Sequence, residues 1–480
     1  MNHPRFPPFK AAAHFSSSFV VLGLLAFALV GCTTHPEKLG LAYAGETRAE
    51  NVAFLVDETW VDSAGTRHVR QEIFEAVREM INAAEEFVVL DFFLMNDFGY
   101  EPGVGLRPLT QDLTDWLIAK RAADPEVEVI FITDPVNSMY GSLESPQFSA
   151  MTNAGIQVVE TNLDKLRDSN PMYSKPWRVL VKPWGVGPGS TLKNPMGEGR
   201  VSLRSMLKLV NFKANHRKVV VTDKSILLTS ANPHSASSAH WNIALRVDGA
   251  GQKLALEMES AVLEFSGAEG ALADRLIGEE PAPLQGNRIE LLSEIKIKEK
   301  VLAVLEAAQA GARVDLCMFY LSEKEVIKAF GAAKKRGVDV RVILDPGKDS
   351  FGRTKNGVPN RQAGAKLVKA GIPLRWADTH GEQCHVKMLY AERPDGTATL
   401  LLGSSNYTRR NLNNFNCEAN IAFTAPREDP TLVRARETFD RWWNNEQNRL
   451  FTADYEVFED TSRWRRFSAW WGETTGMSIF

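Results

Sequence analysis

The chain of 480 residues presents the same series of landmarks twice, in the same order. Each half has an apolar, strand-like run, then a helical stretch, then a β-rich run closed by Asp-Pro, then a Gly turn that leads into another strand. The landmarks are the runs 87–97 and 313–323, the pairs Asp134-Pro135 and Asp345-Pro346, and the turns at 153–160 and 369–376. This repetition predicts a duplicated α/β fold, with one sheet per half covered by helices on both faces.

Each half also carries a short polar motif at the head of an apolar run. The first is NHRKVVVTD, with His216, Lys218 and Asp223, and the second is CHVKMLYAE, with His385 and Lys387 and with Glu392 in the place of the aspartate. Alternate side chains of an extended strand share a face, so each His and Lys point the same way. The sequence therefore predicts a paired display of an imidazole and an ammonium group in each half.

A short polar turn follows each motif, TSAN at 229–232 and GSSN at 403–406. The doubled HxKxxxx(D/E) motif with its Ser-x-Asn turn resembles the phospholipase D superfamily, over roughly residues 50–445. That family includes phospholipases, bacterial cardiolipin synthases, phosphatidylserine synthases and some nucleases. The resemblance implies two α-β-α sandwich domains related by a pseudo-twofold, with both His-Lys pairs at one site between them.

Phosphodiester chemistry explains why these residue types occur together. The substrate is an anion, so catalysis needs fixed positive charge, a nucleophile and an acid for the leaving oxygen. Lys218 and Lys387 would supply the charge, while one imidazole attacks phosphorus and the other protonates the leaving alkoxide. Four further donors would hold the phosphate, namely Ser230, Asn232, Ser404 and Asn406. We expect no metal and no cofactor.

The identity of the nucleophile stays open. A neutral imidazole needs an acceptor on its other nitrogen, and in this superfamily a carboxylate downstream of the Ser-Asn turn commonly provides it. Twelve residues after Asn406 comes Glu418, but twelve after Asn232 comes Ala244. This count favours His385 as the anchored nucleophile, whereas family precedent favours His216.

Two further interpretations concern the remaining motif residues. Asp223 and Glu392 fall on the strand face opposite their histidines, so we expect them to buttress the fold. A metal site of His216, His234 and His240 is possible on residue types alone. Lysine is a poor zinc ligand and no carboxylate or thiolate has ligand spacing, so we expect none.

The N-terminus resembles a bacterial lipoprotein export signal. Arg5 and Lys10 precede an apolar run at 19–30 that is short for a membrane span, and the run ends in Leu-Val-Gly-Cys32. The resemblance implies lipid modification of Cys32 and removal of residues 1–31. Because Thr33 is not Asp, it also implies an anchor in the outer membrane, facing the periplasm.

Cysteine count and charge exclude some classes of protein. Cys317, Cys384 and Cys417 remain after Cys32, an odd number that argues against a disulfide scaffold, and a Cys384–Cys417 bridge stays open. The formal net charge is −3. A dedicated nucleic-acid binder is usually basic, so nucleic acid is not the expected partner.

The expected domain plan has a tether, two domains, a linker and a C-terminal segment. Their residue ranges are 32–50, 51–276, 289–450, 277–288 and 451–480, with an insertion near 164–206 in the first domain. The insertion contains Trp177 and Trp184 among lysines, and the C-terminal segment has Trp464, Phe467 and Trp471 at helical spacing. For both segments, contact with a membrane and packing on the protein are open alternatives.

The sequence as a whole predicts a phosphatidyl transferase or hydrolase of phospholipids that works through a phosphohistidine. It would act as a monomer, since one chain holds both motifs. Transfer, as in a cardiolipin synthase, and hydrolysis, as in a phospholipase D, differ only in the acceptor, which the sequence leaves open together with the head group. The alternatives are a nuclease with the same histidines and an inactive scaffold.

Overall fold

The computed structural model describes residues 40–101, 106–189, 191–277, 285–350, 353–354, 356–460 and 462–475. The signal peptide, Cys32 and most of the linker at 277–288 lie outside these residues, so the predictions made for them stay predictions. Within the described residues, no helix combines the length and the apolar character needed to cross a bilayer.

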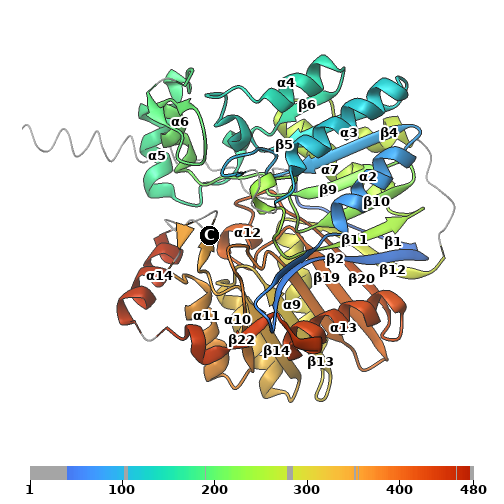
Figure 1. Cartoon of the computed structure of the whole chain (residues 1–480), viewed down its shortest axis with the longest axis vertical. Coiled ribbons are helices and arrows are strands. Elements are labelled where there is room, and N and C mark those ends of the chain that lie inside the picture. Colours follow the sequence, from blue (N-terminus) through green and yellow to red (C-terminus); the bar gives the residue numbers. More distant parts are fainter. Residues whose placement is uncertain are drawn as a thin grey trace, which may run out of the picture.

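Two large sheets share one strand order, which reflects the duplication (Figure 1). In the first sheet the order is β2 (Asn51–Asp62), β11 (Asn242–Asp248), β10 (Ser225–Thr229), β9 (Lys218–Thr222), β4 (Phe87–Phe92), β5 (Glu128–Thr133) and β6 (Gln157–Glu160). In the second it is β12 (Asn287–Ser293), β20 (Ala419–Pro426), β19 (Thr397–Gly403), β18 (Lys387–Glu392), β13 (Arg313–Met318), β14 (Asp339–Leu344) and β17 (Leu374–Ala377). In both sheets the last three strands are parallel and the others antiparallel.

Helices cover the outer face of each sheet. They are α2 (Ile73–Ala83), α3 (Leu109–Ala123) and α4 (Pro146–Asn153) on the first sheet, and α9 (Ile295–Ala307), α10 (Lys324–Lys335) and α11 (Asn360–Lys369) on the second. In α2 the buried residues Ile73, Val77, Met80 and Ile81 recur every three or four positions. That period puts them on one stripe of the helix, against the sheet.

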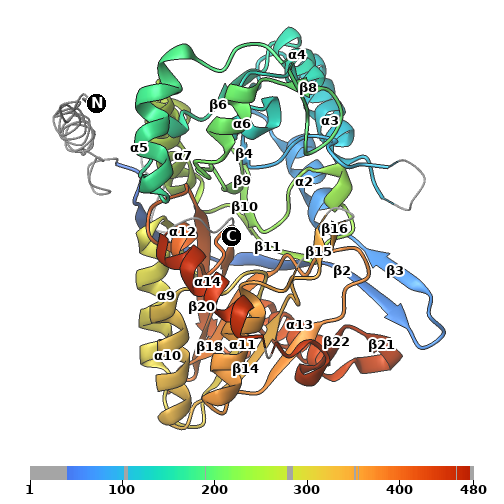
Figure 2. The ribbon, with the colours of Figure 1, turned by 90° about the vertical axis from the view of Figure 1, so that its left-hand side faces the viewer.

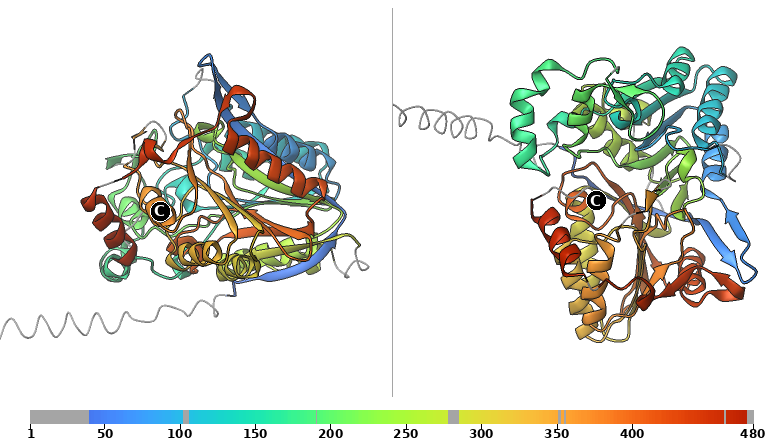
Figure 3. Two further views of the ribbon diagram at one scale, coloured as in Figure 1. Left: turned by 90° about the horizontal axis from the view of Figure 1, so that it is seen from below. Right: turned by 60° about the vertical axis from the view of Figure 1, so that its left-hand side comes forward.

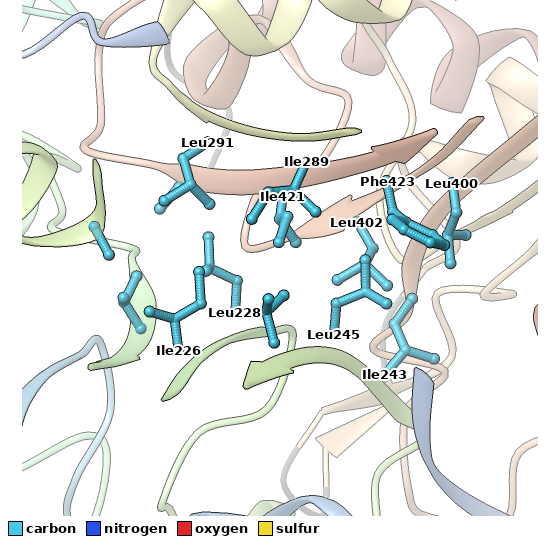
Figure 4. Close-up of a cluster of buried hydrophobic side chains, with 14 of the residues drawn as sticks. Ile226, Leu228, Ile243, Leu245, Ile289, Leu291, Leu400, Leu402, Ile421 and Phe423 are labelled. Carbon is cyan, nitrogen blue, oxygen red and sulfur yellow. The ribbon is translucent and has the colours of Figure 1, made fainter. Parts of the chain in front are cut away.

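The inner faces of the two sheets pack against each other, and Figure 4 shows this core. Alternate residues of each strand point inward. Ile226, Leu228, Ile243 and Leu245 of the first sheet thereby meet Ile289, Leu291, Leu400, Leu402, Ile421 and Phe423 of the second. Two helices, α7 (Gln252–Ser266) and α13 (Pro430–Asn444), cover the rest of the inner faces. The predicted fold class is confirmed, and part of each inner face is covered by the other sheet.

Strands near the chain ends depart from the predicted domain plan. The expected tether contains β1 (Ala44–Ala49), which pairs with β12 and so belongs to the sheet of the second half. The expected C-terminal segment contains β22 (Thr452–Asp454), which pairs with β17, while β21 (Arg449–Leu450) pairs with β2 of the first half. Both ends of the chain thus supply short strands at the edges of the large sheets, where unpaired backbone groups are available.

The first half carries an insertion between β6 and β9. It contains α5 (Pro171–Leu180), the 3-10 helix η4 (Lys182–Trp184), β7 (Leu192–Lys193), β8 (Arg200–Val201) and α6 (Leu203–Leu209). The C-terminal helix α14 (Arg463–Thr475) lies on the same side of the molecule (Figures 1 and 2). Other elements are β3 (Arg67–Arg70), α8 (Leu272–Leu276), β15 (Asp349–Ser350), β16 (Arg353–Thr354), α12 (Arg409–Leu412) and the short helices η2 (Pro135–Ser138), η3 (Leu163–Lys165), η5 (Ser235–Ser237), η6 (Glu446–Asn448) and η7 (Tyr455–Phe458).

The three cysteines of the described residues are buried and free. The Cys317 and Cys384 sulfur atoms lie 3.6 Å apart. The open question of a Cys384–Cys417 bridge is therefore answered against it.

Candidate active site

Both motif histidines line one cavity between the two halves. His216 stands just ahead of β9 and His385 just ahead of β18, at equivalent places of the two sheets. The cavity has a volume of about 320 Å³, and both histidines are among its lining residues. A single phosphate group in this cavity is therefore within reach of both halves of the chain.

Backbone hydrogen bonds between the halves hold the two motifs together. The His216 N–H donates to the Cys417 carbonyl at 2.8 Å, and the Trp241 N–H donates to the Gln383 carbonyl at 3.0 Å. Parallel bridges pair Asn215 with Cys417 and Trp241 with Cys384. Each histidine consequently lies beside the start of a strand that belongs to the other half.

The Glu418 carboxylate is the hydrogen-bond partner of the His216 ring. Its Oε2 lies 3.0 Å from His216 Nδ1, and it also accepts from the Ser404 hydroxyl and, through Oε1, from the Asn411 amide. Burial opposes ionisation of Glu418, yet His216, Lys218 and the Asn411 amide hold its pKa below the usual value. An ionised carboxylate fixes the proton of His216 on Nδ1 and leaves Nε2 with its lone pair.

Asn242 takes the corresponding place for His385. His385 Nδ1 lies 3.2 Å from Asn242 Oδ1, which also accepts from the Ser230 hydroxyl at 3.0 Å. The Asn242 amide nitrogen donates to the His240 carbonyl at 3.3 Å, which is consistent with its oxygen facing His385. The second histidine is thus oriented by a neutral group instead of a carboxylate.

Each orienting residue belongs to the half opposite its histidine, which corrects the expectation drawn from the residue count. Glu418 was expected to anchor His385 of its own half, and it anchors His216 instead. Ser230 N–H donates to the Ile243 carbonyl and Ser404 N–H to the Ala419 carbonyl, so Asn242 and Glu418 are structural counterparts. The count failed because the loop after the Ser-Asn turn is two residues longer in the second half. Asn242 and Glu418 both stand at the start of the strand that follows the turn, β11 or β20, so the strand start is the better reference point for finding them.

Burial controls the protonation of both histidines. It lowers the pKa of His216 to about 4, with Glu418 opposing the shift and Lys218 adding to it. Burial also lowers the pKa of His385 well below its usual value, and Lys387 and Lys218 add to the effect. Both rings are therefore neutral near pH 7, and a bound phosphate anion would favour the protonated form of His385.

Lys218 and Lys387 are buried beside the histidines. The Lys218 ammonium donates to the His216 carbonyl at 2.7 Å, and that of Lys387 to the His385 carbonyl at 2.9 Å. Each lies just over 5 Å from an aromatic ring of the cavity wall, Phe93 or Phe319. Burial lowers the pKa of Lys218 to about 7 and that of Lys387 well below its usual value. An anion in the cavity would raise both values again.

The Ser-x-Asn turns divide into two roles. Asn232 and Asn406 line the cavity, where their amides can meet a phosphate oxygen. Ser230 and Ser404 were expected to do the same. Their hydroxyls instead donate to Asn242 and Glu418, as described above, and both side chains are fully buried. The prediction of phosphate binding by the two serines was wrong, because each hydroxyl holds the residue that orients a histidine.

The motif acids lie away from the cavity and tie strands together. Asp223 Oδ1 accepts from the backbone N–H groups of Glu85 and Glu86, at 3.0 and 3.3 Å, just before β4. Glu392 Oε2 accepts from the Arg313 N–H at 3.4 Å, at the start of β13. Both acids therefore make the strand-buttressing contacts expected for them.

Other polar residues of the cavity had no signal in the sequence analysis. They are Lys213, Ser237, Gln383, Arg410, Asn411 and Asn416, while His240, which the sequence analysis considered only as a metal ligand, also lines the cavity. The side chain of Lys213 forms an ion pair with Asp168 at 3.0 Å. His234, considered above as a metal ligand, has its ring nitrogens 3.0 Å from the Ser237 hydroxyl and the Phe98 carbonyl.

Comparisons with known proteins agree with this site. The family model described as cardiolipin synthase, PLD-like domain matches residues 301–443. The fold is similar to that of phosphatidylserine synthase from Haemophilus influenzae Rd KW20, with a TM-score of 0.56 and 10% identity over 92% of this chain and 98% of that chain. The segment that the family model matches contains the second motif, with His385 and Lys387, and also Glu418.

Two further solved structures are more distant. The phospholipase D family member Nuc from Salmonella typhimurium has a TM-score of 0.27 and 22% identity over 35% of this chain and 98% of that chain. Polyphosphate kinase from Porphyromonas gingivalis has a TM-score of 0.41 and 13% identity over 85% of this chain and 51% of that chain. No curated protein sequence matches the chain.

Proposed function

We propose that the chain is an enzyme of the phospholipase D superfamily and that it transfers or hydrolyses phosphatidyl groups through a covalent intermediate on His216. The observation that carries the proposal is the unequal pair of orienting residues, Glu418 at His216 and Asn242 at His385. A carboxylate stabilises the positive charge that an imidazole gains when it becomes bonded to phosphorus. The neutral partner of His385 leaves that ring more acidic, which suits a proton donor.

In the first half-reaction one bond forms, one bond breaks and one proton is transferred. His216 Nε2 attacks phosphorus to form an N–P bond, the P–O bond to the leaving alkoxide breaks, and protonated His385 gives its proton to the departing oxygen. In the second half-reaction an acceptor hydroxyl returns a proton to His385 and attacks phosphorus, and the N–P bond breaks. The enzyme is then regenerated, with water or a lipid alcohol as acceptor.

The cavity wall supports a lipid substrate over a nucleic acid. Among the described residues, nine apolar or aromatic side chains line it, namely Phe93, Leu94, Val136, Tyr140, Leu209, Phe212, Ala214, Phe319 and Tyr320. Only two lysines or arginines line it, and the net charge of the chain is −3. A groove that follows a nucleic-acid backbone needs several phosphate contacts from lysine and arginine.

The test uses a phosphatidyl ester of p-nitrophenol, because this leaving group needs no acid. The His385→Ala variant should release a burst of about one equivalent of nitrophenol per active site and accumulate a phosphoenzyme. The His216→Ala variant should give neither. A phosphoenzyme on residue 385, or a burst that persists without His216, would reverse the assignment.

The substrate class is tested with the unaltered enzyme. Phosphatidylglycerol should give glycerol together with phosphatidic acid if water is the acceptor, or with cardiolipin if a second lipid is. Single-stranded and duplex DNA are supplied in parallel. Cleavage of DNA without turnover of lipid would replace the proposal by the nuclease alternative.

A further inference from the structure

Exposed apolar side chains are concentrated in two segments of the chain. Among the described residues, ten of the thirteen exposed large hydrophobic side chains lie in residues 171–209 or in α14, which together make up about a tenth of the sequence. They are Met172, Val179, Leu180, Trp184, Leu192, Leu203, Trp464, Phe467, Trp470 and Trp471. Scattered apolar residues are normal on a surface, but a concentration of this kind marks an interaction site.

In the insertion, Trp184 lies exposed on a turn that hydrogen bonds hold in place. The indole is 72% exposed, and the turn is closed by hydrogen bonds from the Gly185 N–H to the Lys182 carbonyl and from Arg204 to the Trp184 carbonyl. Trp177, seven residues earlier, is buried. Of the two tryptophans of this segment, only Trp184 is thus available to a partner.

Helix α14 presents a ridge of aromatic rings that contact one another. The ring of Phe467 lies 5.7 Å from that of Trp464, 5.8 Å from Trp470 and 6.2 Å from Trp471, and all four side chains are about half exposed or more. The helix is fastened to the body of the protein at its start, where Arg465 pairs with Asp460 at 2.8 Å. The helix is thus held in place while its aromatic rings stay exposed at the surface.

Both segments lie on one side of the molecule, next to the active site. In Figures 1 and 2, and in the right panel of Figure 3, α5 and α14 occupy the same side, and α12 lies between them in the first two views. Arg410 of α12 lines the active-site cavity, and so does Leu209 at the end of α6. We call the exposed apolar residues of the two segments the aromatic face.

Residues 171–209, which carry Trp184, are basic, whereas the whole chain is slightly acidic. Residues 171–209 contain seven lysines and arginines and one acid, whereas the chain has a net charge of −3. Three of the seven, Arg178, Lys182 and Lys208, form ion pairs with Asp164 or Asp168 at the base of the insertion. Amphipathic tryptophans among basic residues fit the boundary of a bilayer that carries anionic lipids.

We infer that the aromatic face docks on an anionic phospholipid surface and brings the mouth of the active site to it. This inference rests on the proposed function, because a lipid substrate must leave the bilayer to reach His216. Trp184 and the α14 ridge enter the interface, and the basic side chains near them meet lipid phosphates. Each such side chain is worth about a factor of five in affinity for an anionic surface.

The experiment first measures docking without catalysis. Full-length protein with His216→Ala is mixed with phosphatidylcholine vesicles, with or without phosphatidylglycerol, and amide hydrogen exchange is followed. We expect slower exchange in residues 171–184 and 463–471 with the anionic vesicles alone. No added protection there, or protection that depends on protein concentration without lipid, would overturn the inference, the latter in favour of a second copy as partner.

Turnover then links docking to function. The triple variant Leu180→Ser, Trp184→Ser and Trp464→Ser should lose about tenfold or more on phosphatidylglycerol vesicles. Turnover of dispersed short-chain phosphatidylglycerol should change by less than about twofold, because no bilayer is present. Val69→Ser with Leu450→Ser is the matched control, since these exposed apolar residues lie on strands β3 and β21, away from α5 and α14 (Figure 2).

The possible outcomes separate the two proposals. Equal losses on vesicles and on dispersed lipid, or equal losses in the triple variant and the control, would overturn docking by the aromatic face. Absence of turnover on every lipid would instead overturn the proposed function, and hydrogen exchange would still decide whether the face binds the bilayer.

Discussion

Replacing Glu418 by glutamine tests how His216 is prepared for attack. The carboxylate accepts from three donors, His216 and Ser404 on one oxygen and Asn411 on the other. A glutamine side chain has a single acceptor oxygen, so one side of it must present an NH₂ group to a donor. When that side faces His216, the ring must turn its lone pair to Nδ1 and carry its proton on Nε2, where it cannot attack.

The expected loss follows from this change of tautomer. An amide in place of a tautomer-fixing carboxylate costs about 10³- to 10⁴-fold in kcat. Since each factor of ten is about 1.4 kcal/mol, the barrier rises by about 4 to 5.5 kcal/mol. The pKa of His216 is about 4, so the ring is already neutral near pH 7. Removal of the carboxylate lowers this pKa further, which means that a higher pH cannot restore activity.

The assay measures kcat and the burst phase on the p-nitrophenyl ester across the neutral pH range. Ser404→Ala is the control, because it removes one donor to Glu418 and keeps the carboxylate, and it should cost about tenfold or less. The reasoning fails if Glu418→Gln stays within tenfold of the parent enzyme. It also fails if activity returns as the pH is raised, since the defect would then lie in protonation.

Two further changes address the other side of the site and its support. Asn242→Asp should raise the pKa of His385, because a carboxylate stabilises the protonated ring, so the basic limb of the kcat profile moves to higher pH. An unmoved limb in the pH–rate measurement would contradict the role of His385 as the acid. Arg217→Met should lower the free energy of unfolding by about 3 to 5 kcal/mol in denaturant titration, because Arg217 is fully buried and pairs with Glu294 at 3.0 Å. Arg288→Met, at a partly exposed ion pair with Glu290, is the control, and an equal loss there would show that burial is not the cause.

The duplicated fold could be predicted because its signals are local. Apolar runs, Asp-Pro ends and Gly turns mark the strands one by one, and their order recurs. The edge strands gave no such signal. In β1 the residues alternate between exposed and partly buried positions, and its partner β12 lies about 240 residues further along the chain. Pairing at a sheet edge depends on which backbone groups remain unpaired after folding, and a short polar segment does not reveal that.

In the site, too, the sequence revealed residues that a local pattern marks and missed a contact that is made between the two halves. His216, Lys218, His385 and Lys387 were found because strand alternation and motif repetition are visible in the sequence. Glu418 was also found, but it was attached to the wrong histidine. Spacing along the chain measures distance within one half, whereas the orienting contact is made across the pseudo-twofold.

The crossed contacts follow from the way the halves are joined. Where the inner faces of the sheets meet, the backbone ahead of each His-Lys motif bridges to the other half, next to the residue that orients the histidine. His216 N–H binds the Cys417 carbonyl, which places Glu418 at the ring, and Trp241 N–H binds the Gln383 carbonyl, which places Asn242 beside His385. Because the side-chain hydrogen bond that orients each ring comes from the opposite half, the apolar core between the sheets is a condition for chemistry as well as for stability. The duplication thereby allows one half to change an orienting residue without altering the other, and the glutamate–asparagine difference is the means by which two equivalent histidines can take unequal roles.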